Sequence, residues 1–161
     1  MTDEQWQSEV RDALETASRD KVAAAQRLRQ VASQCQRESA RAAGDWHFEQ
    51  SLGLAATLTA EAGRYRDAVR LYKQLARHHS QALAGHGQSL ASTQTALALA
   101  LFAAGESAAG AKAGREALRW AGQFGDPSAS LETLLGEIRR FLNAQAERRA
   151  RPSRKKRRGR R

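Results

Sequence analysis

An internal repeat restricts the fold of this chain more than any other feature of its sequence. Residues 54–76 can be aligned with residues 96–118 without a gap, and Gly63 then coincides with Gly105 at a spacing of 42 residues. Small residues coincide on both sides of this glycine, at Ala56 with Ala98 and at Ala68 with Gly110. A glycine permits the positive φ of a tight turn, and small flanking residues let two helices approach each other. One such hairpin cannot bury its own apolar face, so the repeat predicts hairpins that stack on their neighbours.

The apolar composition independently favours helices over strands. Ile138 is the single isoleucine, valine is sparse, and alanine and leucine supply most of the apolar side chains. Strands are enriched in β-branched and aromatic residues, whereas alanine, leucine, arginine and glutamine favour helices. The sequence therefore predicts an all-α protein, and 161 residues are enough for one domain with a hydrophobic core.

Glycine and proline divide the chain into about seven predicted helices. Residues 1–43 contain neither, and they are predicted to form two helices that meet near residues 18–20 or, alternatively, one long helix. Further helices are predicted at about 46–62, 65–79, 90–104, 107–124 and 127–146, with a loop at 82–88. Apolar stripes run along the first and last of these helices, at Trp6, Val10 and Leu14, and at Leu131, Leu134, Leu135, Ile138, Phe141 and Leu142.

Within the first copy of the repeat, residues 60–76 read AEAGRYRDAVRLYKQLA. This stretch resembles the turn and second helix of the tetratricopeptide repeat (TPR) family. The spacing of 42 residues is similar to the longer-helix variety of kinesin light chains and many bacterial repeat proteins. The second copy departs from the pattern at Gly114, where the family has an aromatic residue. The resemblance implies a short solenoid of antiparallel hairpins over residues 1–146, and a generic helical bundle is the alternative.

The resemblance also implies a concave groove that is lined mainly by the first helix of each hairpin and binds a peptide or helix of a partner protein. The candidates for its lining are Gln50, Gly53, Thr57 and Glu61 from the helix at 46–62, and Ser92, Thr95 and Leu99 from the helix at 90–104. The family's clamp for chaperone tails relies on asparagine and lysine, and Asn143 is the single asparagine, so this ligand is not expected. Alternatively, each candidate is a solvated surface residue without a ligand.

Positive charge is concentrated at the C-terminal end of the sequence. Of the net charge of +10, residues 147–161 carry +9 and residues 1–146 carry +1. The C-terminal segment has no apolar stripe, so residues 147–161 are predicted to be disordered in isolation. Its cations are expected to bind the phosphates of DNA or RNA, at Arg148, Arg149, Arg151, Arg154, Lys155, Lys156, Arg157, Arg158, Arg160 and Arg161.

No aromatic side chain interleaves these cations, so the predicted contact with nucleic acid does not depend on nucleotide sequence. The alternative roles are binding to an anionic membrane surface, binding to an acidic patch on a protein, and nuclear import. A solubilising segment without a partner is a fourth alternative. We expect nucleic acid rather than a membrane as the partner.

The sequence contains no motif that predicts an enzyme. It lacks a Walker loop, a dinucleotide fingerprint and a nucleophile elbow, so we expect no catalytic residues and no cofactor. His78 and His79 are neighbours on a predicted helix and point about 100° apart, while His86 lies in a glycine-rich loop, so no metal site is expected. Cys35 lies on an apolar stripe and is predicted to be a buried structural residue rather than a nucleophile.

Several features predict a soluble protein of a reducing compartment. The chain has one cysteine, and residues 1–10 lack the apolar segment of a secretory signal. The most apolar run, residues 95–104, is too short to span a bilayer. We expect a cytoplasmic location, or a nuclear or nucleoid-associated one if the basic segment acts as a targeting or DNA-binding element. Arginine outnumbers lysine 22 to 5, which suggests a GC-rich genome and fits a bacterial source.

These observations lead to three functional hypotheses. In the first, the protein is an adaptor whose helical body binds a protein partner and whose tail contacts nucleic acid or another polyanion, so that the two contacts reinforce each other. In the second, it is a structural or oligomerising module, in which the last helix or the N-terminal helices pair with another copy. In the third, it is a bacterial regulator or immunity-type protein that neutralises a partner through its groove.

Overall fold

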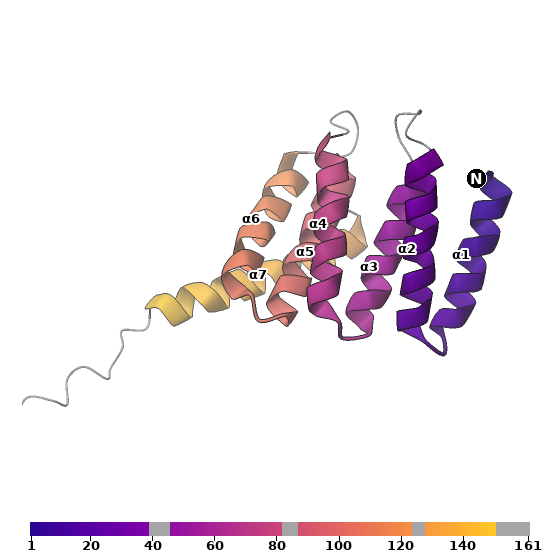
Figure 1. Ribbon diagram of the computed structural model, residues 1–161. Helices are drawn as coiled ribbons and strands as arrows, with labels where there is room; N and C mark the ends of the chain where they lie inside the picture. Colours follow the sequence, from indigo (N-terminus) through magenta and orange to yellow (C-terminus); the bar gives the residue numbers. More distant parts are fainter. Residues whose placement is uncertain (39–45, 82–86, 124–127, 151–161) are drawn as a thin grey trace, which may run out of the picture.

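The computed structural model describes residues 1–38, 46–81, 87–123 and 128–150, with only the backbone described at residues 87, 88, 149 and 150. These residues form seven α-helices and no strand (Figure 1). In chain order the helices are α1 (Asp3–Ala17), α2 (Lys21–Glu38), α3 (Trp46–Glu61), α4 (Tyr65–Gln81), α5 (Gly87–Ala103), α6 (Ser107–Gln123) and α7 (Ala129–Ala150). The all-α prediction is confirmed. The helix signals at 44–45 and 125–127, and residues 82–86 of the predicted loop, lie outside the described residues. Residues 87 and 88, also assigned to this loop, are instead the first two residues of α5, so that part of the prediction is wrong.

The N-terminal region forms two helices, so the alternative of one long helix is wrong. At the start of α2 the Asp20 carboxylate accepts hydrogen bonds from the amides of Val22 and Ala23, both at 2.9 Å. The Ser18 hydroxyl donates to the carbonyl of Glu15 at the end of α1, at 2.8 Å. Side-chain caps satisfy backbone groups that have no partner within the helix, and they separate the two helices here without glycine or proline.

The two copies of the repeat form the same turn. Gly63 follows α3 with a φ of 75°, and Gly105 follows α5 with a φ of 81°. Four amide-to-carbonyl hydrogen bonds close the turns, from Gly63 to Ala60 (2.9 Å) and Arg64 to Thr59 (3.1 Å), and from Gly105 to Phe102 (3.0 Å) and Glu106 to Leu101 (2.8 Å). This pair of bonds defines a Schellman motif, whose left-handed residue is glycine because glycine has no Cβ to clash. The repeat in the sequence is thus a repeat in the backbone.

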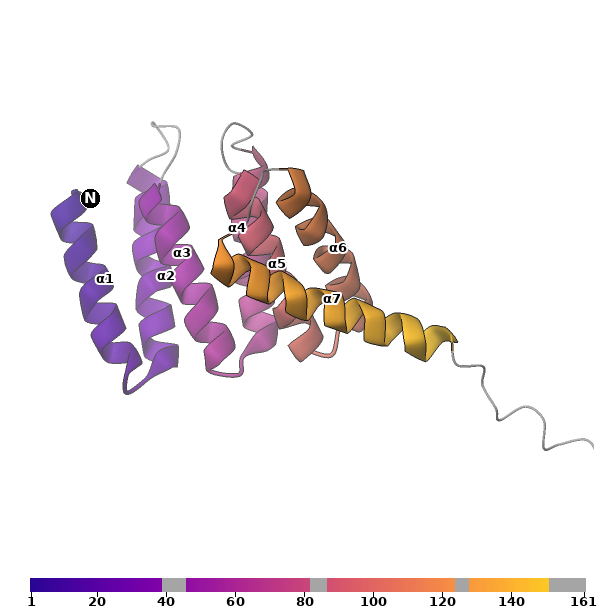
Figure 2. The ribbon, with the colours of Figure 1, turned by 180° about the vertical axis from the view of Figure 1, so that it is seen from behind.

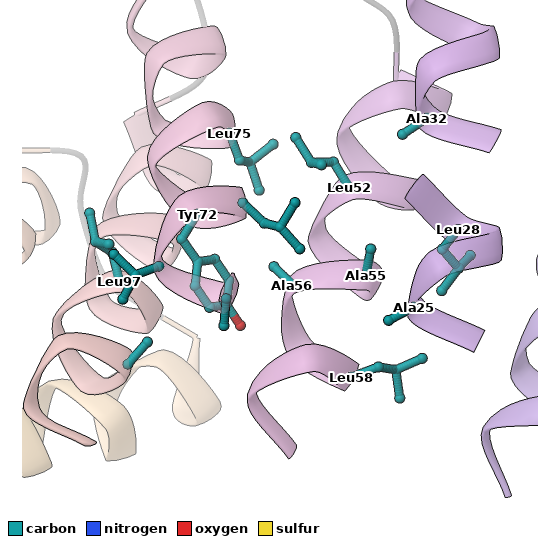
Figure 3. Close-up of a cluster of buried hydrophobic side chains, with 14 of the residues drawn as sticks. Ala25, Leu28, Ala32, Leu52, Ala55, Ala56, Leu58, Tyr72, Leu75 and Leu97 are labelled. Atoms are coloured by element: carbon teal, nitrogen blue, oxygen red, sulfur yellow. The ribbon is translucent and has the colours of Figure 1, made fainter. Parts of the chain in front are cut away.

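The helices pack mainly against their neighbours in sequence. Helices α1 to α6 stand side by side as an antiparallel row, and α7 crosses α5 and α6 (Figures 1 and 2). Small buried residues permit the close approach, because Ala55 of α3 points toward α2 while Ala56 points toward Tyr72 of α4 (Figure 3). Helix α3 is therefore buried on two sides, and the core continues through it along the row.

The two end helices are less buried than their apolar stripes predict. In α7, Ile138 is fully buried, but Leu134 and Phe141 are 37% and 46% exposed, and Leu14 of α1 is 44% exposed. Helix α1 packs on α2 and α3, and α7 packs on α5 and α6, so each is covered on one side only. Helical periodicity predicts an apolar stripe along each end helix, but a helix that packs on one side only buries just part of that stripe.

Helix α7 also continues four residues beyond its predicted end at Ala146. The predicted disordered tail was expected to begin at Glu147, but Glu147 and Arg148 are helical, and the helix ends at Ala150. Alanine, glutamate and arginine favour helices, and extension of an existing helix requires no apolar stripe. The start of the basic segment is therefore carried on α7.

Candidate functional site

A groove of about 460 Å³ runs beside α3, α4 and α5 and reaches the start of α7. We call it the α3–α5 groove, and its lining consists of Glu49, Gln50, Gly53, Leu54, Thr57, Leu75, His79, Ser89, Ser92, Thr93 and Ser128. The five residues from α3 fall at positions i, i+1, i+4, i+5 and i+8 and so share one face of the helix. Ser128 accepts a hydrogen bond from the amide of Leu131 at 3.3 Å, so the residue that caps α7 also borders the groove.

Four residues selected from the sequence as groove candidates lie in this lining, namely Gln50, Gly53, Thr57 and Ser92. The Thr57 hydroxyl donates to the carbonyl of Gly53 at 3.1 Å and lies 3.2 Å from the Tyr72 hydroxyl. Burial raises the pKa of the Tyr72 phenol, so this hydroxyl keeps its proton at neutral pH. Thr57 is thereby fixed in orientation at the wall of the groove.

The other three candidates do not line the groove. Thr95 is fully buried and its hydroxyl donates to the carbonyl of Ala91 at 2.8 Å, so its selection as a groove residue is wrong. Glu61 forms an ion pair with Lys21 of α2, with Nζ and Oε2 2.8 Å apart. Leu99 packs against the hydrophobic core. A helix in the middle of the row is buried on more than one side, and the sequence alone does not show which of its faces stays open.

A buried polar cluster at one end of the groove has no signal in the sequence. The Glu49 carboxylate lies 3.1 Å from His78 Nε2 and 3.3 Å from His79 Nε2. On the other side of the second imidazole, His79 Nδ1 lies 3.2 Å from the hydroxyl of Thr93. Both histidines therefore reach one carboxylate, although they are adjacent on α4, and only the packing of α3 against α4 brings them to it.

A chain from hydroxyl to imidazole to carboxylate has the connectivity of a catalytic triad. Thr93 is only 5% exposed, however, and its hydroxyl is engaged with His79 Nδ1 at 3.2 Å. A nucleophile must reach the substrate, so this arrangement is better suited to holding the groove wall in place than to attacking a bound molecule. Glu49 belongs to the lining, but its side chain is only 11% exposed and its carboxylate faces the two histidines.

The sequence predicts no metal site at these histidines. Among the described residues, no three His, Cys, Asp or Glu side chains lie in an arrangement that could hold a metal ion. His86 lies outside the described residues. Cys35 is buried among apolar side chains of the core, and the prediction of its burial is confirmed.

The predicted phosphate-binding cations lie at the end of α7 and beyond it. Arg148 is exposed near the C-terminal end of α7, and Arg149 continues its backbone. The remaining eight cations, at positions 151–161, lie outside the described residues. Of the basic segment, the structure thus describes only its first four residues, 147–150, at the C-terminal end of α7 (Figure 2).

Comparisons of the chain with protein-family models, with curated proteins and with solved structures found no match. None of the helices in the described part of the chain combines the length and the apolar character needed to cross a membrane. The described residues therefore form an all-α structure of seven helices that pack mainly with their sequential neighbours, and no family is identified.

Proposed function

We propose that this protein is a non-enzymatic, TPR-like adaptor. Its α3–α5 groove binds an extended segment of a protein partner, and its C-terminal basic segment contacts nucleic acid or another polyanion. The observation that carries the proposal is that Gln50 and Thr57 of α3 and Ser92 of α5 line one groove, because the sequence pattern predicts them on the first helices of successive hairpins. The identical Schellman turns, 42 residues apart, support the TPR-like assignment.

The lining of the groove suits an extended peptide. Hydroxyl and amide side chains from α3 and α5 can donate to and accept from the backbone of a bound chain, whose amides and carbonyls need partners when water is excluded. Leu54 and Leu75 offer an apolar contact within the same groove.

The basic segment contributes the second contact. Residues 147–161 contain ten Lys and Arg and one acidic residue, and each phosphate that they neutralise releases a counterion. Arginine meets phosphate oxygens with two parallel hydrogen bonds. Because both contacts are on one chain, occupation of either raises the effective concentration at the other.

The groove contact is tested with a random-peptide display library panned on the intact chain. Selected peptides are then measured against a Gln50→Ala/Thr57→Ala/Ser92→Ala variant and a matched control, Gln26→Ala/Gln30→Ala/Ser33→Ala, which removes three exposed neutral side chains outside the groove. We expect about tenfold weaker binding to the groove variant, from the loss of two or three hydrogen bonds, and unchanged binding to the control. Equal loss in both variants would reject the groove as the binding site.

The polyanion contact is tested with a 20-base-pair DNA duplex and a variant in which the eight Lys and Arg of residues 151–161 are serine. If the segment contacts six or more phosphates, affinity for the intact chain falls by about 10³-fold between 50 and 200 mM salt. The serine variant should lose most of the affinity and most of the salt dependence. Retention of both by the serine variant would exclude the tail as the contact.

One observation favours a second candidate, an oligomerising module. On one face of α1, Leu14 is 44% exposed and borders, together with the buried Val10 and Trp6, a shallow hollow of about 540 Å³. A second copy that paired through this face would bury the leucine. Light scattering over a dilution series separates the two functions. A stable dimer that a Leu14→Glu substitution dissociates, in a protein with no affinity for DNA, would support the oligomerising module.

A further inference from the structure

A second groove, of about 590 Å³, lies on a different side of α5 from the α3–α5 groove. Residues of α4 and α6 form its walls, and residues of α5 form its floor. The ribbon of α5 lies between those of α4 and α6 (Figure 1). Leu90, Leu97 and Leu101 of α5 border the floor. Eleven residues separate the first and last of these leucines, so the floor is about 16 Å long at the helical rise of 1.5 Å per residue. We call this the α4–α6 groove.

Small side chains keep the α4–α6 groove open. Ala76 faces it from α4, and Ala109 and Ala113 face it from α6. Larger residues at these positions would fill the space between the two walls, as leucines do elsewhere in the core. The floor and the lower walls are therefore mainly apolar, with Gln94 as the polar residue of the floor.

The rims of this groove are positively charged. Lys73 and Arg77 lie one turn apart on α4, and Lys112 and Arg119 lie two turns apart on α6, with Glu116 as the single acidic residue of the lining. All four cations are exposed, and none of them forms an ion pair with another described residue. The rims thus carry a net charge of +3, whereas residues 1–146 as a whole carry +1. The positive charge is a local property of this groove and not of the helical body.

We propose that the α4–α6 groove is a docking surface for an acidic peptide segment of a partner protein. Carboxylates of the segment pair with the cations of both rims, and apolar side chains of the segment reach the alanine-walled floor. The inference is independent of the α3–α5 groove and gives the body a second protein-binding face. Like-charge repulsion excludes the basic segment of the same chain as the occupant, because that segment carries ten Lys and Arg.

Two features favour a peptide over a polynucleotide. Glu116 lies between Lys112 and Arg119 and would repel a continuous row of phosphates, whereas a peptide can place an uncharged residue there. The apolar floor also matches side chains rather than a sugar–phosphate backbone. Gln94, at the same floor, has a buried amide oxygen without a hydrogen-bond partner among the described residues, so its rotation toward a peptide N–H breaks no bond of that oxygen.

The probe is a fluorescein-labelled 14-residue peptide of glutamate and leucine, with leucines at positions 3, 6, 7, 10 and 14, measured by fluorescence anisotropy at 150 mM salt. A second peptide has lysine in place of glutamate, a third has the same composition with the leucines scrambled, and a 20-nucleotide thymidine oligomer represents nucleic acid. All proteins carry serine at the eight Lys and Arg of residues 151–161, so that this segment does not bind the acidic probe. The comparison is repeated with the intact chain.

The decisive variant is Lys73→Glu/Lys112→Glu, which reverses one charge on each rim. Its matched control is Arg29→Glu/Arg37→Glu, which makes the same change of net charge at exposed positions on α2. Circular dichroism checks that both variants keep the helical content of the parent. We expect the acidic amphipathic probe to bind the groove variant about tenfold more weakly than the parent, and to bind the control within twofold of it.

The lysine peptide should not bind, and the scrambled peptide should bind more weakly than the amphipathic one. No binding of the acidic probe to the parent, or equal loss in both variants, overturns the proposal. Binding of the thymidine oligomer that depends on Lys73 and Lys112, without peptide binding, also overturns it and assigns the groove to nucleic acid.

Discussion

The hairpins α3–α4 and α5–α6 have the same backbone turn but differ in the side chains that pack between their helices. Their turns are closed by the same hydrogen bonds, and Ala56 and Ala98 are fully buried at equivalent positions of the first helices. The second helices differ. Where α4 has Ala68 and Tyr72, α6 has Gly110 and Gly114. The second hairpin has therefore lost side-chain volume at two positions that the first hairpin fills.

The loss at Gly110 is compensated within the same hairpin. A Cβ at position 110 would lie 2.9 Å from the ring of Phe102, which stands where the first hairpin has Ala60. The Phe102 ring of α5 thus occupies space that a side chain at position 110 of α6 would otherwise take. Phe102 in turn stacks on Phe141 of α7, with ring centroids 4.7 Å apart and planes inclined by 15°.

The loss at Gly114 is compensated from outside the hairpin. A Cβ at position 114 would lie 2.8 Å from Cγ2 of Ile138, a fully buried residue of α7. In the first hairpin Tyr72 fills the equivalent space with its own ring. Gly114 differs from its counterpart Tyr72 in the first copy of the repeat, and in the structure it makes room for α7. The two hairpins therefore differ because one packs against another hairpin and the other packs against a single closing helix.

The largest effect on stability is expected when the side chain of Ile138, which α7 packs against Gly114, is removed. An Ile138→Ala substitution leaves a cavity beside Gly114 and should lower the free energy of unfolding by about 2–5 kcal/mol, measured by urea denaturation. Leu134→Ala is the control on the same helix, because Leu134 is partly exposed, and it should cost less than about 1 kcal/mol. Equal costs at the two positions would contradict the role assigned to Ile138.

A methyl group at position 114 tests the same contact from the other side. Gly114→Ala should destabilise by about 1–3 kcal/mol, because its Cβ meets the branched side chain of Ile138. Gly122→Ala, in the same helix and with no atom within 4 Å of the added Cβ, should be neutral or stabilise by up to about 1 kcal/mol. In an Ile138→Ala background the penalty at Gly114 should largely disappear, and a purely additive double variant would count against the contact.

The turns should respond equally, because they are the part that the two hairpins share. Gly63→Ala and Gly105→Ala each force a residue with a Cβ into a positive φ, where no atom lies within 4 Å of the added group. Each should cost about 1–2 kcal/mol of backbone strain, measured by urea denaturation. A difference above about 1 kcal/mol between the two variants would show that the turns are not equivalent.

The smallest effect is expected at Tyr72, the residue that only the first hairpin has. Tyr72→Phe keeps the ring and removes the hydroxyl near Thr57, which should cost about 0.5–1.5 kcal/mol at neutral pH. Burial raises the pKa of Tyr72, so the unfolded chain loses this proton first as pH rises past the ordinary value of 10.0. The stability that this shift contributes is complete below pH 10.0 and falls above it. Urea denaturation from about pH 9 to 11 should therefore show a steeper decline for the parent than for Tyr72→Phe.

The positions of the helices and turns were largely predictable from the sequence. Asp20, Gly63 and Gly105 mark boundaries that the structure confirms, because each acts on backbone groups within a few residues. The groove was predictable only in part. Gln50 and Thr57 line it but Thr95 does not, because the exposed face of α5 depends on which helices pack on its other sides.

The sequence by itself determined that the chain is helical, where most helices begin and end, and that two hairpins share one turn. These properties follow from helix propensity, capping and the φ angles open to glycine, all of which are local. Only the tertiary structure decided where α7 lies, that Glu49 meets His78 and His79, and that four cations border one groove. Those outcomes depend on contacts between side chains that are far apart in the sequence, such as Gly114 with Ile138. The spacing of residues along the chain does not predict such contacts.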